Sequence, residues 1–418
     1  MAILISVGTE LLLGDITNTN FSYLARELAA LGIPLYREVS VGDNPDRLRT
    51  VLADALSSDD LVITTGGLGP TRDDLTKETA ASLFGTSLIR DPKAVDNIID
   101  RLRGRTLTEN NLKQADLPDG CIPFYNSVGT APGFALSRDD RTLMMLPGVP
   151  HEMKTMFREW VVPILRSRCP FTIYSRNLHV TGIGESTVDS LIGDLADSAN
   201  PTVAPYCKAG ETRLRISARA ADAESARRMV DDMEEKLRAT EAGQYVYFTT
   251  ESGDDADRAP QLAAFTALRS AGLTVAFAES ITGGLCAKLI TDFPGASSVL
   301  RGSAVTYATE TKTTVLGVKR ETVEGCGVVS EECAAEMAAG ARALWGSDIA
   351  VATTGLADDS FYPDGRGLEA GTVCIAIADV DGVEARTYRF RKHPREYVRE
   401  LAAAAAMRWI AEKVRSEE

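Results

Sequence analysis

The residues best suited to chemistry lie in the run TTGGLGPTRDD, which follows an apolar strand-like stretch and ends at Asp74. Its glycines and hydroxyl side chains are Thr64, Thr65, Gly66, Gly67, Gly69 and Thr71. Glycines adopt backbone angles closed to other residues and let the chain approach a ligand closely. Successive backbone amides in such a turn form a cradle for an anion, which the N-terminus of a following helix strengthens. The run lacks the Lys-Ser/Thr ending of a Walker A motif, so it predicts a phosphate-binding loop of another kind.

Two acids, Asp73 and Asp74, stand directly beside this loop. Two carboxylates repel a diphosphate unless a hard cation lies between them. Mg²⁺ favours one or two carboxylates together with waters and phosphate oxygens. We therefore predict a site for Mg²⁺ or a similar divalent metal at Asp73 and Asp74. In the alternative interpretation, one of these acids caps the next helix and the glycines form only a tight turn.

Further polar residues would complete this first site. Thr9 and Glu10 follow the first apolar run, and ligands of open α/β sheets bind beyond the carboxyl ends of the strands. Glu10 would hold a metal or a ribose hydroxyl, or else is only solvated. Lys113 is expected to neutralise a phosphate, and Gln114 beside it offers a polar contact.

A second set of reactive side chains follows the strand-like residues 274–280 in the last third of the chain. Ser280 and Thr282 stand there just before Gly283 and Gly284. A Ser at a strand-to-helix turn is well placed as a nucleophile, with backbone amides nearby for an oxyanion. The same pattern is also typical of a simple helix N-cap.

Lys312 is the candidate base for this second site. His393 is the one His in this part of the chain, and it lies in a charged run, so Ser-Lys chemistry is better supplied than Ser-His-Asp chemistry. A Lys acts as a base only when burial or a neighbouring cation lowers its pKa. Tyr307 would relay the proton or orient the Lys, and Glu279 would bind substrate or form a salt bridge.

Composition excludes several classes of protein. The 418 residues include 45 Lys and Arg against 59 Asp and Glu, a formal net charge of −14 with no long basic run, so nucleic-acid binding is excluded as a main role. No apolar stretch approaches membrane-spanning length, and the N-terminus lacks the features of a signal peptide. Seven cysteines without a CxxC pair suit a reducing compartment. We expect a cytoplasmic protein that acts on a small molecule.

The elements that must position these groups fall into three blocks. Residues 1–168 alternate strand-like and helical runs, which predicts a layered α/β domain. Residues 169–247 follow the order strand, helix, strand, strand, helix, strand, the split βαβ pattern of a small α+β domain. Residues 248–260 are rich in Ser, Gly, Asp and Pro and are predicted to be a linker. Residues 261–418 predict a second layered α/β domain.

Several motifs together resemble those of the CinA family (competence/damage-inducible protein A). They are GTELLLGDITNTN, TTGGLGPTRDDLTKE, NSVGTAPGF and LPGVPHEM in the first block, and AESITGGL, PGASSVLRGSAVTYA and VVSEECAAEMAAGA in the third. The resemblance covers nearly the whole chain and implies a three-layer α/β/α molybdopterin-binding fold for residues 1–168. It also implies that this domain is a metal-dependent ADP-ribose pyrophosphatase, releasing AMP and ribose 5-phosphate, and that the protein is a dimer.

For residues 261–418, the resemblance implies a nicotinamide mononucleotide deamidase, which hydrolyses a carboxamide and releases ammonia. The family's Ser, Tyr and Lys correspond to Ser280, Tyr307 and Lys312, with Thr282 and Gly283 as substrate-binding neighbours.

The chain departs from the family pattern in this last domain. Ile281 stands where the family has a small residue, and Ala308 and Thr309 replace Ser-Asn. The family's TGIAGPGGG loop is replaced by TGLADDSFYPDGRGLEAGTV. Two glycines are lost there, and Asp358 and Asp359 add negative charge near a phosphate site, which weakens nucleotide binding unless Arg366 compensates.

We therefore expect a nucleotide-salvage hydrolase whose first domain cleaves the diphosphate of ADP-ribose with a divalent metal. Two alternatives stay open. In one, deamidation is the main activity and the first domain only binds its ligand; in the other, the protein is a non-catalytic pterin- or nucleotide-binding module.

Overall fold

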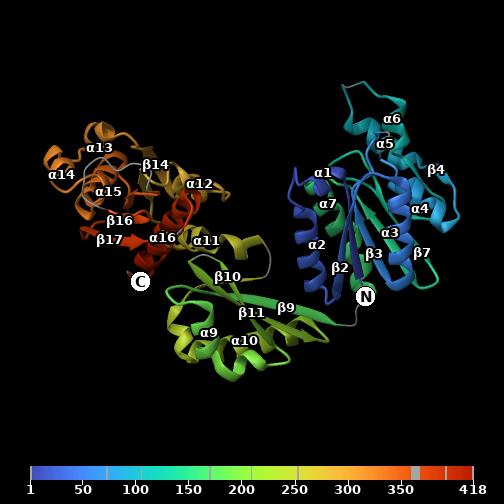
Figure 1. The fold of residues 1–418 in the computed structure, drawn as a ribbon, viewed down its shortest axis with the longest axis horizontal. Helices are drawn as coiled ribbons and strands as arrows, with labels where there is room; N and C mark the ends of the chain where they lie inside the picture. The colour runs from blue at the N-terminus through green and yellow to red at the C-terminus, as the bar shows by residue number, and fades with distance from the viewer. Residues whose placement is uncertain are drawn as a thin grey trace. The chain divides into compact units, whose positions relative to one another are not determined.

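The computed structural model describes residues 2–71, 74–104, 106–168, 171–208, 210–251, 254–358, 368–390 and 393–416. Strands and helices alternate through most of this length (Figure 1), so the predicted α/β class is confirmed. The chain forms two compact units, residues 1–175 with 217–230 and residues 176–216 with 231–418.

A six-stranded sheet organises the first domain. Its strand order is β2 (Leu35–Val41), β1 (Ala2–Val7), β3 (Leu61–Thr65), β8 (Arg141–Leu146), β7 (Gly133–Arg138) and β6 (Ile122–Phe124). The first four are parallel, and β7 and β6 continue the sheet in antiparallel fashion. Every residue of β1 and β3 is buried, as expected for strands covered on both faces.

Helices cover both faces of this sheet. Side chains from α2 (Thr19–Ala30), α7 (Pro150–Met156), η1 (Phe157–Val161) and α8 (Val162–Arg168) form one apolar cluster. Side chains from α3 (Pro45–Ser58) and α4 (Thr76–Phe84) form a second cluster on the opposite face. This confirms the three-layer α/β/α prediction. Smaller elements are α1 (Thr9–Leu13), β4 (Leu88–Arg90), α5 (Pro92–Arg101), α6 (Glu109–Lys113) and β5 (Asp116–Pro118).

The middle part has a four-stranded sheet in the order β10 (Thr202–Lys208), β11 (Glu211–Ala220), β9 (Thr172–Val180) and β12 (Val246–Glu251). Helices α9 (Glu185–Ile192) and α10 (Ala223–Ala239) complete the predicted split βαβ order. The segment 248–260, predicted as a linker, contains regular structure. Strand β12 continues to Glu251 because it pairs with β9, and a 3-10 turn spans Asp254–Arg258.

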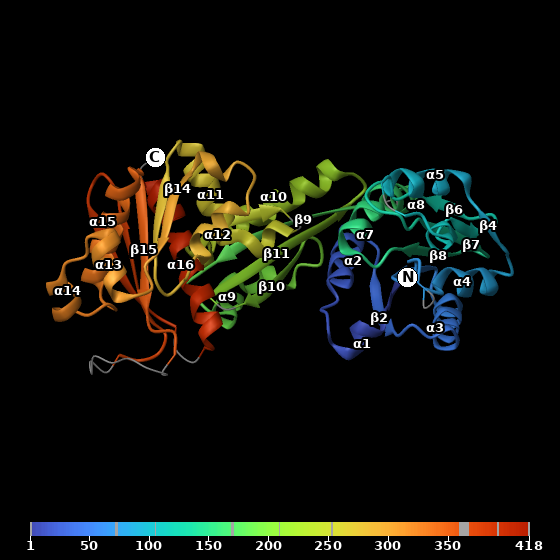
Figure 2. The same cartoon turned by 90° about the horizontal axis from the view of Figure 1, so that it is seen from above.

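The last domain is built on a five-stranded sheet in the order β14 (Leu300–Val305), β13 (Val275–Glu279), β15 (Ile349–Gly355), β16 (Thr372–Ala378) and β17 (Val383–Arg389). Figure 2 shows α13 (Thr309–Leu316) and α15 (Glu331–Trp345) on one side of β15, with α11 (Ala259–Ala271) and α16 (Arg395–Ser416) on the other. Each side has its own apolar cluster. The shorter helices are α12 (Leu285–Thr291) and α14 (Arg320–Gly325).

Candidate functional site

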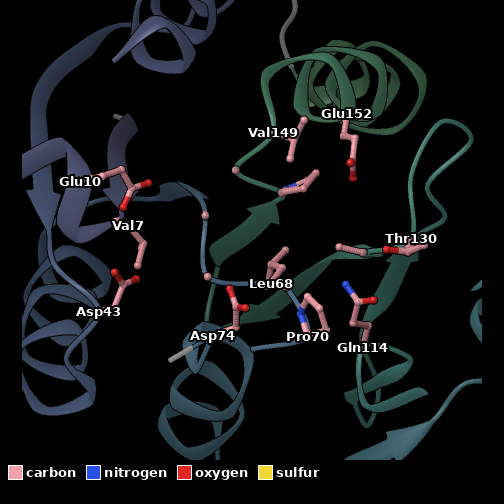
Figure 3. Close-up of a pocket in the computed structure, with 17 residues that line it drawn as sticks. Val7, Glu10, Asp43, Leu68, Pro70, Asp74, Gln114, Thr130, Val149 and Glu152 are labelled. Atoms are coloured by element: carbon pink, nitrogen blue, oxygen red, sulfur yellow. The ribbon is translucent and has the colours of Figure 1, made fainter. Parts of the chain in front are cut away.

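A cavity of about 520 Å³ opens at the carboxyl edge of the first sheet, where β1, β3 and β8 end (Figure 3). Its lining comes from the ends of these strands, from the turn after β2, and from the segments around Gln114, Thr130 and Glu152. The lining residues are Val7, Gly8, Glu10, Asp43, Gly66, Gly67, Leu68, Gly69, Pro70, Asp74, Gln114, Thr130, Ala131, Pro147, Gly148, Val149 and Glu152. The predicted glycines and two predicted acidic positions, Glu10 and Asp74, are thus brought to one cavity.

Two positions in the turn after β3, Gly66 and Gly67, can be occupied only by glycine. Gly66 and Gly67 have φ angles of +106° and +68°, in the region that disfavours side chains. A Cβ on Gly66 would clash with the Val7 carbonyl oxygen, and a Cβ on Gly67 would clash with Thr76 Oγ1. The backbone here therefore lies against its neighbours on one side and lines the cavity on the other.

The predicted ligand contacts Thr64 and Thr65 lie behind this turn. Thr65 Oγ1 donates to the Pro147 carbonyl at 2.9 Å and accepts from Asn20 Nδ2 at 2.9 Å. Asn20 Nδ2 also donates to the Gly148 carbonyl at 2.8 Å. Thr64 is fully buried in β3. Neither Thr lines the cavity, and Thr65 instead ties the turns after β3 and β8 to helix α2.

Asp74 faces the glycine turn. Its Oδ2 accepts from Thr71 N at 2.9 Å and from Thr71 Oγ1 at 2.5 Å, and a Cβ on Gly69 would lie 2.5 Å from it. Helix α4 is capped at Leu75 without a side-chain hydrogen bond. Asp74 therefore does not play the helix-capping role of the alternative interpretation. The predicted partner Asp73 lies outside the described residues.

A divalent metal at this position stays a prediction. Among the described residues, no three His, Cys, Asp or Glu side chains gather closely enough to hold a metal by themselves. The donors around the cavity are carboxylate oxygens, which suit Mg²⁺, and Mg²⁺ needs only one or two of them when phosphate oxygens and waters supply the rest. Asp74 is one such donor, so the residues present fit a metal that arrives with its substrate.

Two further carboxylates line the cavity that the sequence analysis did not predict. Asp43 follows β2 and binds Thr9, whose N and Oγ1 both donate to Asp43 Oδ2 at 2.8 Å. Glu152 lies in α7, after β8, and accepts from Asn126 Nδ2 at 2.7 Å. Both follow the carboxyl ends of parallel strands, which is the signal that would have found them. Thr9, predicted to bind substrate, instead positions Asp43.

Gln114 lines the cavity, whereas Lys113, which was predicted to bind a phosphate there, does not. Lys113 does not line the cavity; its Nζ pairs with Glu78 at 3.1 Å and its carbonyl accepts from Lys77 Nζ. Gln114 lines the cavity while only 3% exposed. Neighbouring residues of a chain point in different directions, so only one of these two side chains faces the cavity. The sequence does not reveal which one.

The second candidate site joins the two residues predicted as nucleophile and base. Lys312 Nζ lies 3.0 Å from Ser280 Oγ and donates to the Thr306 carbonyl at 2.6 Å. Lys312 in α13 is 1% exposed, whereas Ser280 at the end of β13 is half-buried. Burial lowers the pKa of the Lys312 ammonium below its ordinary value, and the nearby Cys333 opposes this shift. The pair therefore meets the requirement stated for a Lys base.

Glu279 holds the turn that carries Ser280. This fully buried carboxylate accepts from the backbone amides of Gly284, Cys286 and Ala287 at 2.8–3.0 Å. The hydroxyls of Thr282 and Ser303 also donate to it, at 2.7 and 3.1 Å.

These contacts change two expectations. The amides at the start of α12 are satisfied by Glu279, so they are not available to an oxyanion in this arrangement. Thr282 Oγ1, predicted to bind substrate, bonds Glu279 and lies 2.7 Å from Thr353 Oγ1. Gly283 has a φ of +58° and forms part of the turn. Glu279 was considered as a substrate or salt-bridge group, and its observed contacts are those of a helix anchor.

Tyr307 has a different partner from the one expected. It is 61% exposed, and its hydroxyl accepts from Arg395 Nη2 at 2.7 Å. Arg395 Nη1 donates to Asp358 Oδ2, also at 2.7 Å. The charge expected from Asp358 is therefore balanced by an arginine of α16. A proton-relay role of Tyr307 stays a prediction, and Asp359 and Arg366 lie outside the described residues.

Comparison with known proteins covers almost the entire chain. Family models match as a probable molybdopterin binding domain (residues 3–167), the damage-inducible protein CinA KH domain (175–247) and the CinA C-terminal domain (259–414). A putative competence-damage inducible protein of Clostridium acetobutylicum is 42% identical over 416 residues, which is 98% of each chain. The chain belongs to the CinA family.

Other CinA relatives match at similar levels. A putative competence-damage inducible protein of Clostridium botulinum is 46% identical over 360 residues, 85% of this chain and 86% of that protein. The crystal structure of the protein CinA with unknown function from Thermoplasma acidophilum is 37% identical, covers 39% of this chain and 96% of that one, and has a TM-score of 0.37. Within the described residues of this CinA protein, no helix combines the length and apolar character needed to span a membrane.

Proposed function

We propose that the C-terminal domain of this CinA protein is an amidohydrolase that uses Ser280 as nucleophile and Lys312 as base. The observation that carries this proposal is the 3.0 Å separation of Lys312 Nζ from Ser280 Oγ, with the lysine buried. A hydroxyl becomes a strong nucleophile only when a base takes its proton. Burial lowers the pKa of the Lys312 ammonium and so favours the neutral amine that a base requires. The resemblance of the motifs to CinA deamidases points to the carboxamide of nicotinamide mononucleotide as the substrate.

The reaction follows from these two side chains. Neutral Lys312 accepts the proton of Ser280 Oγ while the oxygen attacks the carboxamide carbon. The C–N bond then breaks, and the protonated Lys312 returns its proton to the departing ammonia. Water hydrolyses the resulting acyl-serine ester, releasing a carboxylic acid and restoring Ser280. The Thr306 carbonyl keeps Lys312 Nζ directed at Ser280 throughout, because it accepts a second amine hydrogen.

The test is ammonia release from nicotinamide mononucleotide by the full chain. We expect Ser280→Ala and Lys312→Met each to lower the rate about a hundredfold or more, the usual contribution of a positioned base. Lys319→Met is the matched control, since Lys319 is 72% exposed and should leave the rate unchanged. Normal ammonia release by Lys312→Met, or none by the wild type, would refute the proposal.

We propose a second activity, hydrolysis of ADP-ribose to AMP and ribose 5-phosphate, in the N-terminal domain. It is supported by one cavity that combines the glycine turn with Asp74. Four carboxylates line this cavity, from Glu10, Asp43, Asp74 and Glu152, so a diphosphate would be repelled there without a cation. Asp73 and Asp74 would hold a divalent cation, which neutralises phosphate oxygens and makes a water more acidic. The glycine amides would orient the diphosphate.

The test of this second activity is AMP formation from ADP-ribose with and without Mg²⁺. We expect activity only with the metal, and its loss in the Asp73→Asn, Asp74→Asn double variant. Asp100→Asn, at a 65% exposed side chain, is the control for removal of one negative charge. Full activity of the double variant would show that the metal assignment is wrong.

A further inference from the structure

A second cavity, of about 420 Å³, lies in the second compact unit of the chain. Its lining shares no residue with the N-terminal cavity and includes neither Ser280 nor Lys312. The walls come from β10 and β11 of the middle sheet, from the start of α11, and from helices α12 and α16. Its volume is within the range of small-molecule sites.

One face of α16 forms a continuous wall of this cavity. Tyr397, Leu401, Ala404 and Arg408 line it, and their spacing of four, three and four residues places side chains on the same face of a helix. With a rise of about 1.5 Å per residue, Arg408 stands about 16 Å along the helix axis from Tyr397. The wall therefore carries an aromatic ring at one end, a cation at the other and apolar side chains between them.

Among the described residues, no carboxylate pairs with Arg408, although its side chain is half-buried. The other two cations of the lining are paired, Lys208 with Glu211 at 3.2 Å and Lys288 with Asp292 at 2.6 Å. A half-buried charge costs free energy when it is unpaired, so an anion that enters the cavity is stabilised at Arg408.

The acids of the lining do not cancel this charge. Glu211 is engaged in the ion pair just given, and Asp257 pairs with Arg213 at 3.2 Å. Glu400 is exposed and precedes Arg408 by eight residues, which is about 12 Å along the helix axis. Within the described residues, the Arg408 guanidinium therefore remains open to an anion and the Glu400 carboxylate to a hydroxyl group.

This arrangement matches the chemistry of a nucleoside monophosphate. An arginine presents a planar fork of donors to phosphate oxygens. The Tyr397 ring and apolar side chains such as Leu285 and Leu289 of α12 can pack against a planar base. The carboxylate of Glu400 can accept from ribose hydroxyls. A molecule with only the charge or only the ring would match only one end of the wall.

The helices that form this cavity also hold the turn that carries Ser280. Helix α12 contributes to the lining, and the amides at its start bind Glu279. In α16, Arg399 Nε donates to the Ile281 carbonyl at 3.2 Å, and its Nη2 donates to the Thr282 carbonyl at 3.0 Å. A ligand that bridges α12 and α16 therefore stabilises the present arrangement of this turn.

We propose that this cavity is an effector site for a nucleoside monophosphate, whose phosphate binds Arg408 and whose base lies toward Tyr397, and that its occupation activates the amidohydrolase. The regulatory part rests on the proposed function of Ser280 and Lys312, whereas the binding part does not. AMP, the product proposed for the N-terminal domain, belongs to this class of ligand and serves as the probe.

The first experiment measures hydrogen exchange in the full chain with and without AMP. We expect slower exchange in residues 285–291 and 397–408, and Arg408→Gln should need about tenfold more AMP for the same protection. Arg408→Lys keeps the charge, so it should bind with intermediate affinity and guards against misfolding of the glutamine variant. Arg320→Gln, at an exposed position of α14 outside the lining, is the control for loss of one positive charge.

Adenosine and inorganic phosphate, added separately, should each protect these residues less than AMP does. Equal protection by adenosine would mean that Arg408 does not bind the phosphate, and equal protection by inorganic phosphate would leave only a simple anion site. Either result would refute the nucleotide site. Absence of protection by AMP, or protection that Arg408→Gln leaves unchanged, would refute it as well.

The second experiment tests the regulatory part by ammonia release at a nicotinamide mononucleotide concentration well below KM, so that the substrate does not itself fill the cavity. We expect AMP to raise the rate about twofold or more, and Arg408→Gln to lose this response. An unchanged rate, or a fall that persists in Arg408→Gln because AMP competes at Ser280, would refute the activation. Arg408-dependent protection in a chain that releases no ammonia would refute the amidohydrolase proposal, and with it the activation, while the binding site would stand.

Discussion

Lys312 and Ser280 show how burial creates reactivity at the scale of single residues. An exposed lysine is protonated at neutral pH and cannot act as a base. Lys312 is enclosed in α13 next to a half-buried serine, so the charged form is disfavoured while the serine stays accessible.

This burial predicts the pH dependence of amide hydrolysis. Burial moves the pKa of Lys312 below its ordinary 10.5, and only the neutral amine accepts the Ser280 proton. We therefore expect kcat/KM for nicotinamide mononucleotide to rise as pH increases through the lowered pKa and to level off before pH 10.5.

A pH–rate profile of the wild type and of Lys312→Arg checks this expectation. The guanidinium stays protonated throughout, so the arginine variant should show little activity at any pH. A rate independent of pH, or one that is still rising above pH 10.5, would contradict the assigned role.

In the N-terminal site, the single residue that can be tested in the same way is Asp74, the proposed metal ligand. In Asp74→Asn the side chain can still accept the hydrogen bonds of Thr71, but its negative charge is gone. We expect AMP formation from ADP-ribose to fall about tenfold or more and to need a higher Mg²⁺ concentration. A titration with Mg²⁺ measures this, and an unchanged metal dependence would argue against Asp74 as a ligand.

At the scale of elements, one carboxylate fastens α12 to the end of β13. The buried Glu279 carboxylate accepts hydrogen bonds from three amides at the start of the helix, from the Thr282 hydroxyl before it and from the Ser303 hydroxyl in β14. Glu279→Gln replaces one acceptor oxygen with a donor that faces other donors. We expect a loss of about 3 kcal/mol in local stability, from hydrogen bonds to a buried charge.

Hydrogen exchange at the amides of Gly284, Cys286 and Ala287 measures that loss directly, because it reports local opening. All three should exchange faster in Glu279→Gln, and the Ser280-dependent rate should fall with them. Glu321→Gln, at an exposed position of α14, is the control. Unchanged exchange would mean that Glu279 does not anchor the turn.

The glycine turn between β3 and α4 makes a second prediction about elements. Gly67 has a φ of +68°, and the Cβ added by Gly67→Ala would clash with Oγ1 of Thr76, the first residue of α4. We expect ADP-ribose hydrolysis to fall about tenfold, because the turn must shift. Gly85→Ala is a close control: its φ is +65°, yet nothing lies within 4 Å of the added atom. Equal effects of the two variants would assign the loss to backbone strain alone.

At the scale of the whole molecule, the two candidate sites stand on separate sheets with separate apolar cores. Independent cores predict independent loss of function. Ser280→Ala should lower ammonia release about a hundredfold and leave AMP formation within about twofold of the wild type. Asp74→Asn should lower AMP formation about tenfold and leave ammonia release within about twofold. Both activities measured on each full-length variant provide the check. A single substitution that removed both would show that the two sites are coupled.

The layered domains were predictable because their signals are local. Buried strands such as Ala2–Val7 and Leu61–Thr65 are continuous apolar runs, and the glycines of the turn at 66–69 are visible as residue types. The α/β class and the split βαβ order follow from such patterns. The pairing of Ser280 with Lys312 was predicted from the residue types available and from the resemblance to the CinA family, and the structure brings the two side chains together.

The sequence by itself determined the family, the fold class and the identity of the glycine turn and the Ser-Lys pair, since each depends on residue type and spacing. Only the tertiary structure decided which side chains face the cavity. Thr65 turned toward Pro147, Lys113 toward Glu78, and Gln114, Asp43 and Glu152 came to the lining. The physical reason is that a side chain's direction and its competing partners are set by contacts between segments far apart in the chain, such as Thr9 with Asp43.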